Sequence, residues 1–110
     1  MMRSDQVFFY IRPIDFRNGI DGLTCLCKKE LQRDPMNGGM FVFCNKRRHS
    51  IKILFYDGQG YWVYHKRLSQ GKFHWWPKGE LVAQLAVKEL SVLIWNGDIE
   101  GSRLQDLFKM

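Results

Sequence analysis

Short runs of apolar residues, separated by polar turns, divide the chain into segments with the periods of strands and helices. The β-rich run Gln6–Ile11 predicts a first strand. It stops before Pro13, which has no N–H to donate to a neighbouring strand. Apolar residues at near-helical spacing then predict a helix, with Asp21 as its N-cap, that runs to about Arg33 and ends at Asp34-Pro35.

The middle of the chain has the pattern of consecutive hairpins. Met40–Cys44 and Ile51–Tyr56 are strand-like, and the polar loop 45–50 joins them. The motif Asp57-Gly58-Gln59-Gly60 is typical of a tight hairpin turn, and it leads into a third strand at Tyr61–Arg67.

The hairpin turn also predicts the strand register. If it places Tyr56 opposite Tyr61, then Lys52 pairs with His65, because cross-strand partners follow in steps of one from the turn. The loop 45–50 enters the strand that contains Lys52, so its charges fall at the same end of the sheet. This predicts one basic rim rather than scattered charge: Lys46, Arg47, Arg48, Lys52, Lys66 and Arg67, with His65 beside them.

Two further elements follow the hairpins. Leu81–Leu85 predicts another strand, and Val87–Trp95 predicts a helix that stops at Asn96-Gly97. The expected inward side chains of this helix are Leu90, Leu93 and Ile94. The remaining residues 101–110 are expected to form a tail or a short helix. The pattern therefore predicts an α+β fold, in which a small antiparallel sheet of hairpins is packed by an N-terminal helix and a C-terminal helix.

Composition supports one folded domain spanning residues 1–110. Of the 110 residues, 45% are hydrophobic and 25% are charged, which is the profile of a globular protein and not of a disordered one. Three cysteines, with no secretory leader ahead of them, favour a cytoplasmic protein. No apolar run approaches the roughly 18 residues that span a bilayer, so we expect no membrane partner.

The positive charge is concentrated in the middle of the chain. Residues 40–78 contain eight Lys and Arg against a single acid, Asp57, while the whole chain has a net charge of +6. Lys72 belongs to this segment, which is also the richest in aromatic residues. Basic side chains displace the counterions of phosphates, and exposed rings stack on unpaired bases, so the segment favours nucleic-acid binding. The alternative is a solvated rim over an ordinary aromatic core, and core packing is the expected role of Trp75 and Trp76.

Metal-dependent catalysis would require a cluster of carboxylates. Asp15, Asp21 and Asp57 form the only plausible set, but Asp21 suits a helix cap and Asp57 suits a turn. Asp15 is two residues from Arg17, and their side chains can pair and fix the connection between them. We therefore expect no catalytic residues, no metal site and no cofactor.

The cysteines do not have the spacing of a zinc site. Cys25 and Cys27 are two residues apart on a predicted helix, so their thiols point in nearly opposite directions. Cys44 and His49 would have to complete such a site. Buried free thiols are the simpler interpretation.

Three blocks of sequence resemble a known family. They are Asp15-Phe16-Arg17-Asn18-Gly19-Ile20-Asp21-Gly22-Leu23, the stretch from Phe41 to Trp62 with its Asn45-Lys46-Arg47-Arg48 loop, and Tyr64-His65-Lys66-Arg67-Leu68 with Gly71-Lys72-Phe73. In this order they resemble the TnpB-type accessory proteins of the IS66 group of bacterial insertion sequences. That family shares only a name with the RNA-guided nuclease also called TnpB.

The resemblance implies a small protein that is encoded beside a separate DDE-type transposase and is needed for transposition. It implies no catalytic residues, since the family has none assigned. Combined with the charge pattern, it favours a non-enzymatic accessory factor that binds the DNA ends of the element and assists the transposase. The alternative is an adaptor that binds the transposase through aromatic side chains and has little direct contact with DNA.

Overall fold

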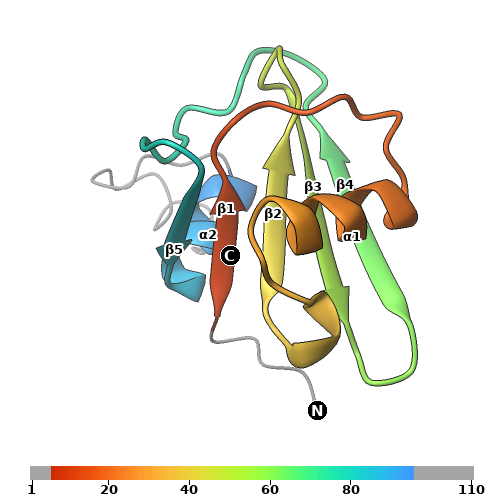
Figure 1. The fold of residues 1–110 in the computed structure, drawn as a ribbon. Helices are drawn as coiled ribbons and strands as arrows, with labels where there is room; N and C mark the ends of the chain where they lie inside the picture. The colour runs from red at the N-terminus through yellow and green to blue at the C-terminus, as the bar shows by residue number, and fades with distance from the viewer. Residues whose placement is uncertain (1–5, 96–110) are drawn as a thin grey trace, which may run out of the picture.

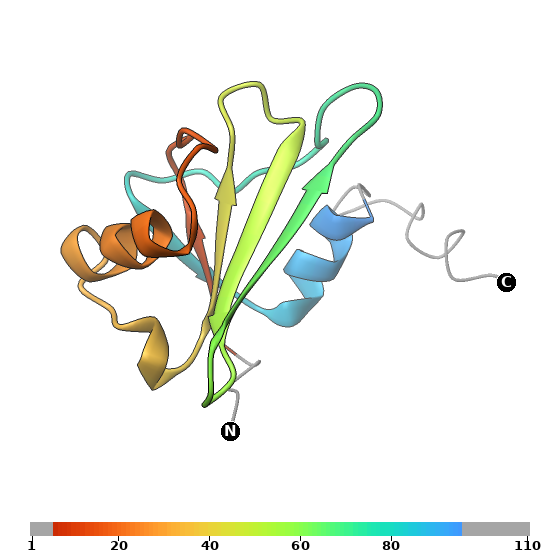
Figure 2. The same cartoon turned by 90° about the vertical axis from the view of Figure 1, so that its right-hand side faces the viewer.

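The computed structural model describes residues 6–95 and places them in three layers, with a sheet between two helices (Figures 1 and 2). The strands are β1 (Val7–Tyr10), β2 (Met40–Cys44), β3 (Ser50–Tyr56), β4 (Tyr61–Arg67) and β5 (Val82–Leu85). The helices are α1 (Ile20–Lys29), the 3-10 helix η1 (Pro35–Asn37) and α2 (Val87–Ile94). The sheet has five strands in the order β4-β3-β2-β1-β5.

The predicted hairpins are confirmed together with their register. β2 pairs antiparallel with β3, and β3 pairs antiparallel with β4. Tyr56 lies opposite Tyr61, and Lys52 lies opposite His65, as the turn predicted. In that turn, the Asp57 carboxylate accepts hydrogen bonds from the backbone N–H groups of Gln59 and Gly60, each at 2.8 Å. Asp57 therefore has the structural role expected from the sequence.

The expectation of an all-antiparallel sheet is wrong at the centre, because β1 and β2 run parallel. Their connection, residues 11–39, contains α1 and crosses one face of the sheet (Figure 1). Parallel neighbours need a long crossover of this kind, whereas a hairpin joins antiparallel ones. β5 then pairs antiparallel with the other edge of β1. The sheet is therefore mixed.

The first helix is shorter than predicted, and Asp21 is not its N-cap. Gly19 occupies that position in an extended conformation, and Asp21 lies in the first turn of α1, where a carboxylate favours the positive end of the helix dipole. Apolar spacing continues to the buried Leu31. However, the helix ends at Lys29, and Gln32 has a left-handed φ of 53°. Leu31 thus contributes to the core from beyond the helix.

Alternating side chains divide the core between the two faces of the sheet. From β1, Phe8 and Tyr10 point toward α1, while Val7 and Phe9 point toward α2. Figure 2, in which the sheet is nearly edge-on, shows α1 and α2 on opposite sides. β1 and β2 are buried on both faces, which explains why their sequences are nearly continuous apolar runs.

The C-terminal elements agree with prediction where the structure describes them. β5 and α2 lie at the expected positions, Leu90 and Leu93 are buried, and Ile94 is partly buried against the same cluster. The predicted stop at Asn96-Gly97 and the tail 101–110 lie outside the described residues. Within residues 6–95, none of the helices has the length and apolar character needed to cross a membrane.

Candidate functional site

Three connections meet at one end of the sheet, drawn uppermost in Figure 1. They are the segment from β1 to α1, the loop from β2 to β3, and the segment that follows β4. Backbone hydrogen bonds join them: Leu68 N–H donates to the His49 carbonyl at 2.7 Å, and Phe73 N–H donates to the Arg48 carbonyl at 2.8 Å. Ile14 N–H donates to the Cys44 carbonyl at 2.9 Å. The loops at this end therefore form one connected surface.

Asn45 organises the loop that contains three consecutive basic residues, Lys46, Arg47 and Arg48, which form a basic triplet. Its side-chain oxygen accepts hydrogen bonds from the backbone N–H groups of His49 and Ser50, both at 3.1 Å. Its amide nitrogen lies 2.7 Å from His49 Nδ1. Because the amide nitrogen can only donate, His49 Nδ1 is the acceptor in this contact, and Nε2 is the ring nitrogen left to donate. Arg48 adopts a left-handed φ of 57°. The intervening Lys46 and Arg47 side chains, like that of Arg48, are exposed.

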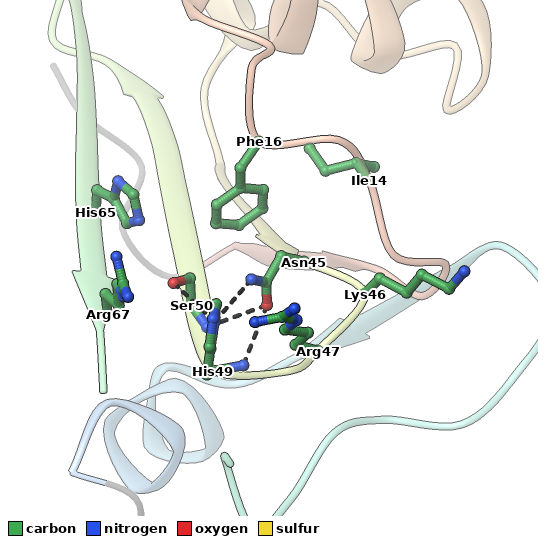
Figure 3. A pocket seen from close by; sticks show the side chains of 9 residues that line it. All are labelled: Ile14, Phe16, Asn45, Lys46, Arg47, His49, Ser50, His65 and Arg67. Atoms are coloured by element: carbon green, nitrogen blue, oxygen red, sulfur yellow. Dashed lines mark hydrogen bonds between the residues drawn. The ribbon is translucent and has the colours of Figure 1, made fainter. Parts of the chain in front are cut away.

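A hollow of about 520 Å³ lies beside this loop (Figure 3). Its apolar wall comes from Ile14 and Phe16 of the β1–α1 segment. Lys46, Arg47 and His49 line it from the loop, and the side chains of His65 and Arg67 line it from β4. Neither Asp nor Glu is among its lining residues. The hollow therefore favours an anion.

The basic residues of the 45–50 loop and Arg67 of β4 form no salt bridge within the described chain. The one salt bridge among residues 6–95 joins Asp15 and Arg17, whose hydrogen bonds lower the pKa of the Asp15 carboxyl to about 2. Four basic side chains at this end take no part in it. Together we call them the basic edge: Lys46, Arg47, Arg48 and Arg67. Partial desolvation of the His65 ring lowers the pKa of its imidazole, and the positive charges of Lys52 and Arg67 lower it further.

Two predicted members of the rim have their ammonium groups bound to backbone carbonyls. The side chain of Lys52 is 9% exposed. Its Nζ donates to the carbonyls of Phe16 and Asn18, both at 2.8 Å. Lys66 points to the opposite face of the sheet, where its Nζ donates to the carbonyl of Ile94 at 2.5 Å. The structure thus separates these two lysines from the basic edge.

Lys72, the last predicted site residue, is exposed on the segment after β4. The neighbouring Phe73 donates its N–H to the Arg48 carbonyl. Because Lys72 directly precedes Phe73, this bond brings Lys72 close to the basic triplet.

The aromatic side chains separate into a buried group and an exposed group. Trp76 is 6% exposed and donates its Nε1–H to the Ile11 carbonyl, and the partly buried Trp75 contacts Phe9 edge to face. Both have the expected core role. Among the described aromatic side chains, Trp95 after α2 is exposed, and so are Trp62 and Tyr64 on the outer strand β4. Their alternate positions in a terminal hairpin are the sequence signal that could have identified them.

The candidate metal ligands do not come together. Asp57 lies in the β3–β4 turn, while Asp15 pairs with Arg17 at the other end of the sheet. Across residues 6–95, no three His, Cys, Asp or Glu side chains group closely enough to hold a metal ion. The three cysteines are free, with Cys25 exposed and Cys27 and Cys44 buried. Burial raises the pKa of the Cys27 thiol to about 12.

Residues 5–103 match the family described as IS66 Orf2 like protein. The chain belongs to this family. Membership gives it an accessory role associated with transposition of IS66-type elements. The predicted resemblance is thereby confirmed over most of the sequence.

Two relatives come from Sinorhizobium fredii. The protein named y4jC is 33% identical over 92 residues, which cover 84% of this chain and 79% of the relative. The protein named y4hO is 34% identical over 61 residues, which cover 56% of this chain and 53% of the relative. Both are described as uncharacterized proteins. No solved structure matches the chain.

Proposed function

We propose that the protein is a non-enzymatic accessory factor that binds DNA through its basic edge and assists the transposase of the same insertion sequence. The observation that supports this most strongly is the gathering of Lys46, Arg47, Arg48 and Arg67 at one end of the sheet without acidic partners in the described chain. Charges that no carboxylate neutralises can exchange their counterions for phosphates. Family membership supplies the context of transposition.

The proposal assigns different roles to the predicted basic residues. The four side chains of the basic edge contact phosphates, and Lys72 extends the contact along the neighbouring segment. Lys52 and Lys66 support the fold, because their ammonium groups already donate to backbone carbonyls. Contacts of this kind position a protein on DNA without selecting a sequence.

Fluorescence anisotropy on duplex DNA tests the proposal. The variant Arg47→Ala/Arg48→Ala is expected to bind more weakly, and its plot of log affinity against log salt is expected to be shallower by about 2, one unit for each phosphate that the variant no longer binds. Lys28→Ala/Lys29→Ala is the matched control, since it removes two exposed charges from the last turn of α1. If both variants lost the same affinity for DNA, the effect would come from net charge alone, and the basic edge would be rejected as the DNA-binding site.

A second candidate function is that of an adaptor for the transposase. It is supported by the exposure of Trp62 and Tyr64, 49% and 52%, on a strand that pairs on one side only. Aromatic side chains of this kind are enriched in protein interfaces. A complex with the transposase that survives high salt and is lost in Trp62→Ala would favour the adaptor, whereas phosphate contacts weaken steeply with salt.

A further inference from the structure

The hollow at the basic edge has an aromatic wall that phosphate contacts alone do not require. Its volume of about 520 Å³ lies within the range of sites that enclose small organic ligands. In Figure 3 the Phe16 ring points into the space between the β4 side chains and the 45–49 loop. The site thus combines an apolar surface with cations, which suits a ligand that has both a flat ring and a phosphate.

Contacts from two strands hold the Phe16 ring in place. The His65 ring meets it edge to face, with centroids 5.4 Å apart. Lys52 Nζ lies 5.0 Å from the ring centroid and also donates to the carbonyl of Phe16. A ring fixed in this way loses little conformational freedom when a base stacks on it.

The polar residues of the hollow suit a phosphate. Arg47 and Arg67 approach it from the loop and from β4. His49 adds a donor, because its Nδ1 accepts from Asn45 and leaves the proton on Nε2. With no carboxylate in its lining, the hollow does not favour a cation.

We propose that this hollow takes one unpaired nucleotide of a DNA strand, with the base against Phe16 and the phosphate beside Arg47 and Arg67. The inference rests on the proposed DNA binding and adds that the preferred DNA has a single-stranded part. Inside an intact duplex, both faces of each base are covered by stacking, so a base must be unpaired and unstacked to reach such a site.

The test compares two fluorescent DNAs with the same duplex, one blunt and one with a short thymine overhang. Stacking of a base on a protein ring contributes about 1 kcal/mol or more, so we expect the wild type to bind the overhang at least about fivefold more tightly. Phe16→Leu removes the ring and keeps an apolar side chain. Trp62→Leu is the control, since it removes an exposed ring outside the hollow.

The inference predicts that Phe16→Leu binds both DNAs with the wild-type affinity for the blunt duplex, and that Trp62→Leu keeps the preference for the overhang. Equal binding of both DNAs by the wild type would overturn the inference and leave duplex binding intact. The inference would also be overturned if Phe16→Leu kept the preference for the overhang. The same holds if the wild type bound a duplex with an RNA overhang more tightly than the one with the thymine overhang. Failure of the wild type to bind either DNA would overturn the proposed function as well.

A measurement on the unaltered chain covers the case in which Phe16→Leu does not fold. An overhang that contains 5-iododeoxyuridine is irradiated in the complex, and the cross-linked peptide is identified by mass spectrometry. Cross-linking to the peptide that contains Phe16 is expected. Cross-linking to Trp62 or Tyr64 themselves, located within their peptide by fragmentation, would overturn the inference, whereas His65 of the same peptide lines the hollow.

Discussion

His65 lies among positive charges, and its surroundings determine how its protonation affects stability. Its pKa in the folded protein is below the ordinary 6.5, through partial desolvation and the charges of Lys52 and Arg67. As the pH falls through 6.5, the unfolded chain binds this proton before the folded protein does. The contribution of His65 to stability is therefore complete above that pH and is lost as the pH falls through the folded pKa.

The variant His65→Gln is accordingly expected to lose less stability than the wild type between about pH 7.5 and 5.5. Urea denaturation at both pH values measures the difference, and all other titrating groups contribute equally to the two proteins. If the variant and the wild type lose the same free energy of unfolding on acidification, the depressed pKa of His65 has no role.

The directions of individual basic side chains were the least predictable feature of the site. The charge pattern correctly placed Arg67 beside the loop with Arg47, since both follow from the hairpin register. It could not show that Lys52 reaches carbonyls 34 and 36 residues away in the chain. Nor did any local signal identify Phe16, because its exposure to the hollow depends on how the β1–α1 segment crosses the sheet.

Among the elements, the β1–α1 segment is held to the sheet in part by a lysine side chain from β3. Lys52 donates to the carbonyls of Phe16 and Asn18. Lys52→Met preserves much of the apolar stem but removes both charge-assisted hydrogen bonds. Because bonds from a charged group contribute about 1.5 to 3 kcal/mol, we expect a loss of roughly that size in the free energy of unfolding.

Urea denaturation measures this loss, and the salt dependence of DNA binding provides a second observation. Since the Lys52 ammonium is directed inward, the slope of log affinity against log salt should be unchanged in Lys52→Met. A shallower slope with no change in stability would instead identify Lys52 as a phosphate contact, as the sequence alone predicted.

Elements specified by local signals were predicted well, and those specified by distant contacts were not. The turn at Asp57–Gly60 determined the β3–β4 register, because its geometry lies within a few residues. The parallel direction of β1 and β2 was missed, since an apolar run does not encode strand direction. The end of α1 was misplaced because Leu31 continues the helical spacing after the helix has stopped.

At the scale of the whole molecule, the two ends of the sheet differ in chemistry. The basic edge and the hollow lie at the end where the β1–α1 segment, the β2–β3 loop and the segment after β4 meet, and the β3–β4 turn with Asp57 lies at the other (Figure 1). This polarity was anticipated from the charge of residues 40–78 together with the hairpin pattern. It predicts that DNA approaches from one end only, with both helical faces left accessible.

The most direct test of DNA binding by the basic edge is the salt dependence of duplex binding by the wild-type protein. Five phosphate contacts, from the four side chains of the basic edge and from Lys72, predict that log affinity falls against log salt with a slope of about −4 to −5. Fluorescence anisotropy between about 50 and 200 mM salt measures this slope. A slope in that range is the result predicted. Binding that is insensitive to salt, or no binding at about 50 mM, would contradict the central claim.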